Sequence, residues 1–199
     1  MYKIHSIIFY LFSLVVFLLS LPFIVFLLLL VILVDRSNPI FTQIRSGKNG
    51  KLLKLYKITT MKLNKNSNEK YVTSLGNILR ISKLDELPQL INIIKGEMNL
   101  IGPRPLFLEF NRYYKKNHSI RLNLKPGITG LAQVQLNDST NWDSKFDLDV
   151  YYVKNKSFKL DCIILYKTFK KVILSILVKS NRPIESKDYK NDFFQNYLK

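Results

Sequence analysis

The chain has 199 residues, and its 31 lysines and arginines against 14 aspartates and glutamates give a net charge of +17 at neutral pH. This length suits one domain plus an anchor, and the charge favours an anionic partner such as a phosphorylated substrate, an anionic membrane surface or nucleic acid. A single cysteine, Cys162, excludes an intramolecular disulfide, and two histidines far apart, His5 and His118, argue against a zinc site.

An apolar segment without any charged residue runs from Ile7 to Val34. It predicts a membrane-embedded helix, roughly 42 Å long if continuous, against roughly 30 Å of bilayer hydrocarbon. Pro22 divides the segment into two pieces that are each too short to span, and Ser20 can bond backbone carbonyls that the proline frees. A helix-break-helix that re-enters the same leaflet fits this pattern, and so does a kinked helix that spans the membrane.

Basic residues follow the apolar segment closely, and this predicts that its C-terminal side lies in the cytoplasm. They are Arg36, Arg45, Lys48, Lys51, Lys54 and Lys57. We therefore expect an anchor at residues 1–36, a cytoplasmic domain at 37–180 and a polar C-terminal tail at 181–199.

Short elements are predicted along the cytoplasmic domain. Lys48-Asn49-Gly50 lies between two alternating stretches and predicts a hairpin, whereas residues 62–70 are mostly polar and predict a loop. Helices are expected at 75–81, 87–95 and 107–116, a short strand follows Pro126-Gly127, and residues 157–178 are amphipathic to strongly apolar. The pattern indicates an α+β fold: a re-entrant membrane helix, then a small, mostly helical domain with short strands and amphipathic helices lying at the interface.

An acidic pair, Asp85 and Glu86, precedes the predicted helix at 87–95. One carboxylate of such a pair can attack phosphorus while the other holds a metal or moves a proton. Arg80 and Arg104, the latter between two prolines, could hold the charge that develops in phosphoryl transfer, and Mg²⁺ is the natural cation. Acidic residues also stabilise the first turn of ordinary helices, so these residues alone leave both interpretations open.

A longer series of motifs favours the chemical interpretation. LRISKLDELPQL followed by KGEMNLIGPRP resembles the bacterial sugar transferases that are monotopic phosphoglycosyl transferases. The resemblance extends through FTQIRSG, YKITTM, KPGITGLAQV and DLDVYYVKNKSFKLD, in the order and spacing of the family, over roughly residues 12–178.

The resemblance implies a cytoplasm-facing enzyme of the bacterial plasma membrane, anchored by a re-entrant helix. It would transfer a phosphosugar from a UDP-sugar to a polyprenyl phosphate and release UMP. Asp85 matches the family's nucleophile and Glu86 its partner, and both are candidate Mg²⁺ ligands. Arg80, Arg104 and Lys57 match family residues for which we expect phosphate binding.

The chain departs from the family pattern at three places. Family members break the membrane helix at a Ser-Pro pair, whereas Leu21 precedes Pro22 here and Ser20 lies one residue earlier. Thr59 stands where a basic residue is common, and Gln135–Asp138 replaces a segment that often carries a Gly-Arg pair. The last two changes bear on sugar preference and on activity.

A non-catalytic alternative is a basic, membrane-tethered binding or adaptor protein. Nucleic acid is not the expected partner, because the aromatic residues do not interleave with the basic ones in an RNA-binding pattern. Anionic membrane lipids are expected partners. Short family members resemble enzymes that accept UDP-N-acetylated amino or diamino sugars, but the sequence leaves the sugar, the pathway and the oligomeric state open.

Overall fold

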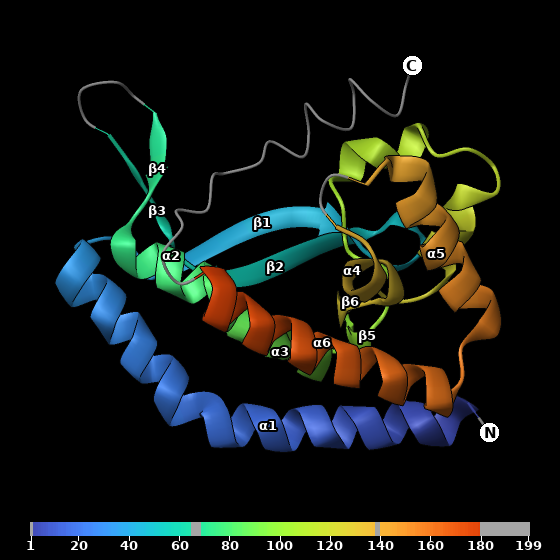
Figure 1. The fold of residues 1–199 in the computed structure, drawn as a ribbon, viewed down its shortest axis with the longest axis horizontal. Helices are drawn as coiled ribbons and strands as arrows, with labels where there is room; N and C mark the ends of the chain where they lie inside the picture. The colour runs from blue at the N-terminus through green and yellow to red at the C-terminus, as the bar shows by residue number, and fades with distance from the viewer. Residues whose placement is uncertain (1, 65–68, 138–139, 180–199) are drawn as a thin grey trace.

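The computed structural model describes residues 2–64, 69–137 and 140–179, and the predicted tail at 181–199 lies outside these residues. The fold is a mixed α+β arrangement, in which a long apolar helix precedes a small, mostly helical domain with short strands (Figure 1). This confirms the predicted fold class at that level.

The long helix α1 (Tyr2–Leu30) continues into one π-helical turn, η1 (Val31–Asp35). Within the described residues, Ile7–Asp35 is the one helix long and apolar enough to cross a membrane. α1 stays helical through Pro22 and is bent partway along its length (Figure 1), so the helix-break-helix around Ser20 and Pro22 stays a prediction. The Ser20 hydroxyl donates to the Phe17 carbonyl at 3.1 Å, a local bond of the kind that lets membrane helices tolerate proline.

Both halves of α1 pack against the rest of the chain. Phe9 in the first half packs against a buried cluster around Tyr152, and Phe17 packs against one around Ile93. Leu27 and Val31 near the other end are buried with residues of the domain. The helix therefore lies along one side of the domain, as Figure 1 shows, instead of projecting from it.

Three two-stranded sheets form the β part of the fold. β1 (Ile40–Ser46) and β2 (Leu52–Ile58) are the predicted hairpin, joined through η2 (Lys48–Gly50), where Asn49 and Gly50 have φ of 56° and 74°. β3 (Met61–Leu63) pairs antiparallel with β4 (Lys70–Val72), so the loop predicted at 62–70 is wrong at its two ends. β5 (Asn99–Ile101) and β6 (Gly127–Thr129) pair in parallel, and β6 is the strand predicted after Pro126-Gly127.

Short helices connect these sheets. α2 (Ser74–Ile81) agrees with its prediction, and Thr73 caps it by accepting from the Gly76 amide at 2.9 Å. The helix predicted at 87–95 is instead a 3-10 helix, η3 (Leu84–Gln89), followed by α3 (Leu90–Ile94), and Gly96 with φ of 71° follows its end. The helix predicted at 107–116 is reduced to η4 (Leu108–Arg112), because Phe110 is buried in an aromatic cluster that fixes the segment.

The C-terminal part contains η5 (His118–Asn123), α4 (Leu131–Gln135), α5 (Trp142–Asn155) and α6 (Phe158–Lys179). α6 covers the predicted amphipathic segment, and it exposes aromatic and aliphatic side chains along much of its length. These include Phe158, Ile163, Tyr166, Phe169, Ile173 and Leu177. Such an exposed apolar surface, interspersed with lysines, is typical of a helix at a membrane surface.

Candidate active site

The acidic pair lies at the start of η3. Lys83, with a left-handed φ of 60°, turns the chain between α2 and η3, and Asp85 and Glu86 occupy the first turn that follows. The pair therefore lies in the first turn of a 3-10 helix that leads into α3, close to the helix start that the sequence predicted. Asp85 is buried, at 8% exposure, so its carboxylate is held by the packing of the turn.

Strand β2 brings Lys57 to this pair. Its Nζ donates to Glu86 Oε1 at 2.8 Å, and both side chains are largely buried. The predicted phosphate-binding lysine is thus paired with the second carboxylate, 29 positions away in sequence. No side-chain hydrogen bond or ion pair to Asp85 is found in the part of the chain that the structure describes. The two neighbouring carboxylates therefore differ in their partners.

This difference moves their pKa values in opposite directions. Burial, and next the charge of Glu86, raise the pKa of Asp85 to about 6, although Lys57, Lys83 and Arg80 oppose the rise. Burial also acts to raise the pKa of Glu86, but Lys57, Arg104 and Lys83 outweigh it and lower that pKa to about 2. At neutral pH both groups are ionised, and Asp85 is the more basic oxygen nucleophile of the two.

Two further cations approach the pair from different elements. Arg80, near the end of α2, donates from Nε to the Thr60 hydroxyl at 2.8 Å, and its charge acts on Asp85. Arg104, in the loop after β5, acts on Glu86. The structure therefore brings together all five predicted residues of the pair and its phosphate-binding set: Lys57, Arg80, Asp85, Glu86 and Arg104.

Sequence reasoning missed Arg45 as a member of this cluster. Its guanidinium lies over the Phe107 ring at 3.6 Å, and burial, together with the charge of Arg104, lowers its pKa to about 10. The residue is part of the FTQIRSG motif, which was the available signal. Thr60, whose hydroxyl accepts from Arg80, was also missed, because this contact joins residues 20 positions apart.

The loop that carries Arg104 is fixed by more than its two prolines. The Gly127 amide donates to the Pro103 carbonyl at 3.0 Å, and the Gly102 amide donates to the Thr129 carbonyl at 2.9 Å. A Cβ atom on Gly127 would lie 2.1 Å from the Gly102 nitrogen, so this close approach requires glycine. The parallel strand pair therefore sets the position of Arg104.

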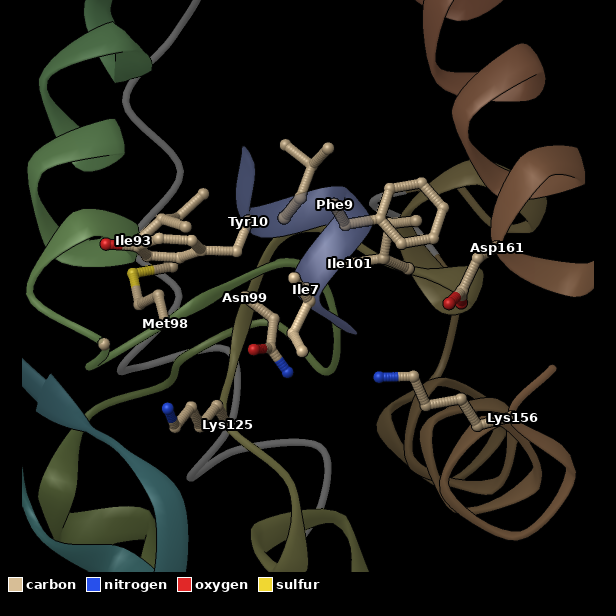
Figure 2. Close-up of a pocket in the computed structure, with 12 residues that line it drawn as sticks. Ile7, Phe9, Tyr10, Ile93, Met98, Asn99, Ile101, Lys125, Lys156 and Asp161 are labelled. Atoms are coloured by element: carbon tan, nitrogen blue, oxygen red, sulfur yellow. The ribbon is translucent and has the colours of Figure 1, made fainter. Parts of the chain in front are cut away.

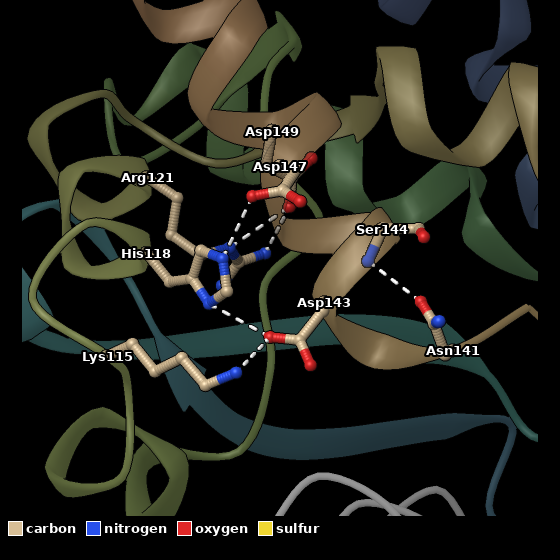
Figure 3. A network of polar contacts seen from close by, with 8 residues as sticks. All are labelled: Lys115, His118, Arg121, Asn141, Asp143, Ser144, Asp147 and Asp149. Carbon is tan, nitrogen blue, oxygen red and sulfur yellow. Dashed lines mark hydrogen bonds and ion pairs between the residues drawn. The ribbon is translucent and has the colours of Figure 1, made fainter.

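A buried ion pair supports the same loop from the other side (Figure 3). Arg121 donates from Nη2 to the Arg104 carbonyl at 2.7 Å, and its Nε and Nη2 donate to Asp149 Oδ2 at 3.0 and 2.7 Å. The Tyr114 hydroxyl accepts from Nη1 at 2.9 Å. His118, close by, contacts Asp147 at 3.0 Å, so η5 is tied to α5 at two points. Arg121 and Asp149 were not predicted, although Asp149 lies in the DLDVYYVKNKSFKLD motif.

The carboxylates fit a magnesium ion only together with a substrate. Among the described residues no group of three or more histidine, cysteine, aspartate or glutamate side chains could hold a metal. Mg²⁺ is usually bound by one or two carboxylates plus substrate phosphates and water. Asp85 and Glu86 are such a donor set, whereas a dedicated protein cage is not present in these residues.

The structure also locates two of the places where the chain departs from the family pattern. Thr59 follows β2, and Gln135 is the last residue of α4. Lys171 caps α4 by donating to the Gln133 and Leu136 carbonyls at 2.6 and 3.0 Å. Asp138 lies outside the described residues.

The chain is similar to known proteins of one family. The model of the family "Bacterial sugar transferase" matches residues 2–175. An uncharacterized sugar transferase of Bacillus subtilis, EpsL, is 42% identical over 145 residues, which cover 70% of this chain and 72% of EpsL.

Two relatives have more specific names. The undecaprenyl-phosphate galactose phosphotransferase of Salmonella typhimurium is 34% identical, and the match covers 70% of this chain and 34% of that protein. The UDP-glucose:undecaprenyl-phosphate glucose-1-phosphate transferase of Escherichia coli is also 34% identical, with 68% and 33% covered. The chain thus spans about a third of the length of these two relatives.

Proposed function

The chain belongs to the bacterial sugar transferase family, and we propose that it transfers a phosphosugar from a UDP-sugar to a polyprenyl phosphate such as undecaprenyl phosphate, as a first membrane step of glycoconjugate assembly. The Salmonella and Escherichia coli relatives are named for sugar-1-phosphate transfer to the same class of lipid. Because the chain matches only part of those proteins, their activity supports this proposal without defining the sugar.

The observation that carries the proposal is the unequal pair at the start of η3. Asp85 is buried, has no hydrogen-bonding cation among the described residues and has a pKa of about 6, while Glu86 is paired with Lys57. A carboxylate that is ionised at neutral pH, basic and free of a strong partner is suited to attack phosphorus. Arg80 and Arg104 add positive charge around it, as the transfer of a phosphoryl group requires.

In the first half of the reaction, a carboxylate oxygen of Asp85 attacks the phosphorus that bears the sugar. An O–P bond forms to Asp85, and the bond from that phosphorus to the bridging oxygen breaks. UMP leaves with the electron pair, and the enzyme carries the phosphosugar as an acyl phosphate. Arg80 and Arg104 stabilise the negative charge on the transferring and leaving phosphates.

In the second half, an oxygen of the polyprenyl phosphate attacks the same phosphorus. The new O–P bond gives a polyprenyl diphosphate sugar, and Asp85 is released as a carboxylate. No proton transfer to Asp85 is required in either half, so its ionised form is the active one. The reaction is therefore expected to fail when Asp85 is protonated.

Asp85 and Glu86 would hold Mg²⁺ together with the diphosphate of the donor. When bound, the ion would supply positive charge to the diphosphate oxygens. Lys57 orients Glu86 before the donor arrives, and together with Arg104 and Lys83 it outweighs the burial that would protonate this carboxylate.

A re-entrant anchor suits this chemistry. Because both halves of α1 pack against the domain, as Phe9 and Leu27 do, an arrangement with both helix ends on the side of the domain is favoured over a perpendicular span. The basic residues after the anchor favour the cytoplasmic side, where UDP-sugars are found. The exposed apolar surface of α6 would then rest at the headgroup level, where the lipid phosphate lies.

The test is UMP release by the purified full chain with Mg²⁺, undecaprenyl phosphate and a panel of UDP-sugars that includes glucose, galactose and N-acetylated amino and diamino sugars. Release with one sugar, absent in Asp85→Asn, supports the reaction and identifies the donor. In a second assay, without the acceptor lipid, the wild-type protein should gain the mass of one phosphosugar. Turnover without any such mass gain would contradict the covalent intermediate.

The anchor has its own test. In a Cys162→Ser background, since Cys162 is exposed and would itself react, a cysteine introduced by Tyr2→Cys should be protected from a membrane-impermeant periplasmic thiol reagent. Labelling of that cysteine in intact cells would mean that the helix spans the membrane.

A further inference from the structure

A cavity of about 200 Å³ lies between the N-terminal half of α1 and the domain, away from the acidic pair (Figure 2). Its walls are of two kinds. Ile7, Phe9 and Tyr10 of α1 line one side and are apolar or aromatic. Asn99 of β5 and two lysines, Lys125 and Lys156, line the other. None of the five residues of the candidate active site contributes to its lining.

The polar side of this cavity lacks partners for its cations. Lys125, Asn99 and Lys156 all line the cavity, and in Figure 2 the Asn99 amide and the Lys156 ammonium face one another while the Lys125 ammonium lies on the other side of Asn99. Within the described residues, neither lysine forms a hydrogen bond or an ion pair, and the Asn99 side chain forms no hydrogen bond. Two ammonium groups and an amide along one cavity supply hydrogen-bond donors for the oxygens of a phosphate.

An aspartate in the lining lowers the net positive charge of the cavity. Asp161 is buried at 2% exposure and accepts a hydrogen bond from the Tyr152 hydroxyl at 2.7 Å. With two lysines and one aspartate the formal charge of the site is +1. A phosphodiester, with a single negative charge, complements this charge, whereas a phosphomonoester carries about −1.5 to −2 at neutral pH. The acceptor lipid of the proposed reaction is such a monoester.

The apolar side indicates where the ligand comes from. Next to the cavity, Ile8, Leu11 and Phe12 of α1 are each about half exposed, so the cavity adjoins the surface of the helix that enters the membrane. A ligand with a phosphodiester head and hydrocarbon chains could place its head on the lysines and its chains along this helix. A free phosphate or nucleotide would leave the apolar side in contact with water.

We propose that this cavity binds the headgroup of an anionic glycerophospholipid, with phosphatidylglycerol as the representative, so that one lipid is held between the anchor and the domain. The site is separate from the transfer chemistry, and the proposal depends only on membrane association. It also adjoins the active-site loop, because the Asn99 amide donates to the Pro126 carbonyl at 2.9 Å and Pro126 precedes the glycine that holds Pro103.

The experiment is native mass spectrometry of the full chain, released from detergent after incubation with equal amounts of phosphatidylglycerol and phosphatidylcholine. The wild-type protein should retain one phosphatidylglycerol in preference to phosphatidylcholine. Lys125→Gln/Lys156→Gln should weaken this retention by about tenfold or more, since both headgroup cations are lost. Lys154→Gln/Lys159→Gln is the matched control, because it removes two exposed lysines on either side of Lys156, in α5 and α6, that do not line the cavity.

Two further variants keep the outcome interpretable. Lys125→Arg/Lys156→Arg preserves the charge and should retain the lipid. Far-UV circular dichroism of each variant will show whether a loss of lipid binding reflects a loss of folding. Asp85→Asn should retain the lipid whether or not the proposed reaction is correct, so failure of one proposal is distinguishable from failure of the other.

Several results would overturn the inference. Equal loss in the control variant would mean that retention follows total surface charge. Equal retention of phosphatidylcholine would remove the preference for a negative headgroup. Displacement of phosphatidylglycerol by inorganic phosphate would identify a site for free anions, and displacement by stoichiometric undecaprenyl phosphate would make the cavity an acceptor site.

Discussion

Asp85 and Asp149 are both buried aspartates among basic side chains, yet they differ in their hydrogen-bonding partners. Asp149 accepts two hydrogen bonds from Arg121, and this ion pair supports the carbonyl of Arg104. Asp85 has three cations near it that lower its pKa, but none of them is bonded to it. One aspartate has its charge matched inside the fold, while the other keeps its oxygen atoms available.

The difference separates a structural carboxylate from a reactive one. Residue type and burial are the same in both cases, and the distinction lies in the hydrogen-bonding partner. Breaking a buried ion pair by removing one member leaves an uncompensated charge and costs stability. Replacing the carboxylate of Asp85 by an amide should instead remove the nucleophile and lower the rate of the reaction. Substitutions at the two aspartates and at their neighbours can test this contrast.

Asp85→Asn should reduce turnover by at least about 10³-fold, because an amide cannot form the acyl phosphate. The fold should persist. The raised pKa of Asp85 means that its ionisation works against the folded state as pH rises through about 4 to 6, so at pH 7 the variant should unfold no earlier than the wild-type protein. UMP release and thermal unfolding in detergent measure the two effects. Near-normal turnover would remove Asp85 from the role of nucleophile.

Arg121→Met should affect stability more than the chemical step. It should destabilise the fold by about 3 kcal/mol or more, because Asp149 would remain buried without its partner. Thermal unfolding should occur several degrees lower. Arg121→Met/Asp149→Leu should recover part of the loss, since the uncompensated charge is removed. A single variant as stable as the wild-type protein would show that the pair does not support the fold.

Arg104→Ala should lower kcat/KM by about 10²-fold through the loss of a charge beside the transferring phosphate. Arg112→Ala is the matched control, because Arg112 is an exposed arginine in the neighbouring η4. Steady-state kinetics of UMP release measures both variants. Equal effects in the two would indicate that only the overall positive charge matters.

The pH dependence gives the smallest but most specific effect. Because the ionised form of Asp85 is active, kcat/KM should fall as pH is lowered through about 6. Lys57→Met removes the strongest of the cations that lower the Asp85 pKa. The acidic limb of the kcat/KM–pH profile should therefore move to higher pH. Lys51→Met, an exposed lysine at the start of the same hairpin strand, should leave the limb in place. An unshifted limb in Lys57→Met would assign it to another group.

Local patterns were predicted well where neighbours in sequence decide the structure. The hairpin at Lys48-Asn49-Gly50 and the helix α2 follow from turn residues and apolar spacing, and both were confirmed. The helix expected at 107–116 failed, because burial of Phe110 against Trp142 decides that segment. α5 was not predicted as a helix, since its apolar residues alternate with many charged ones.

The sequence by itself determined the apolar anchor, the α+β class, the family resemblance and the identity of the acidic pair with its lysine and arginines. These features depend on composition and on short motifs. Only the tertiary structure decided that Lys57 pairs with Glu86 and not with Asp85, that Arg45 joins the cluster, and that Arg121 supports Arg104. Each of these contacts joins residues 17 or more positions apart or depends on burial, and neither is encoded in local spacing. Pro22 predicted a kink in α1, and only the tertiary structure decided that both halves of the bent helix pack along the domain.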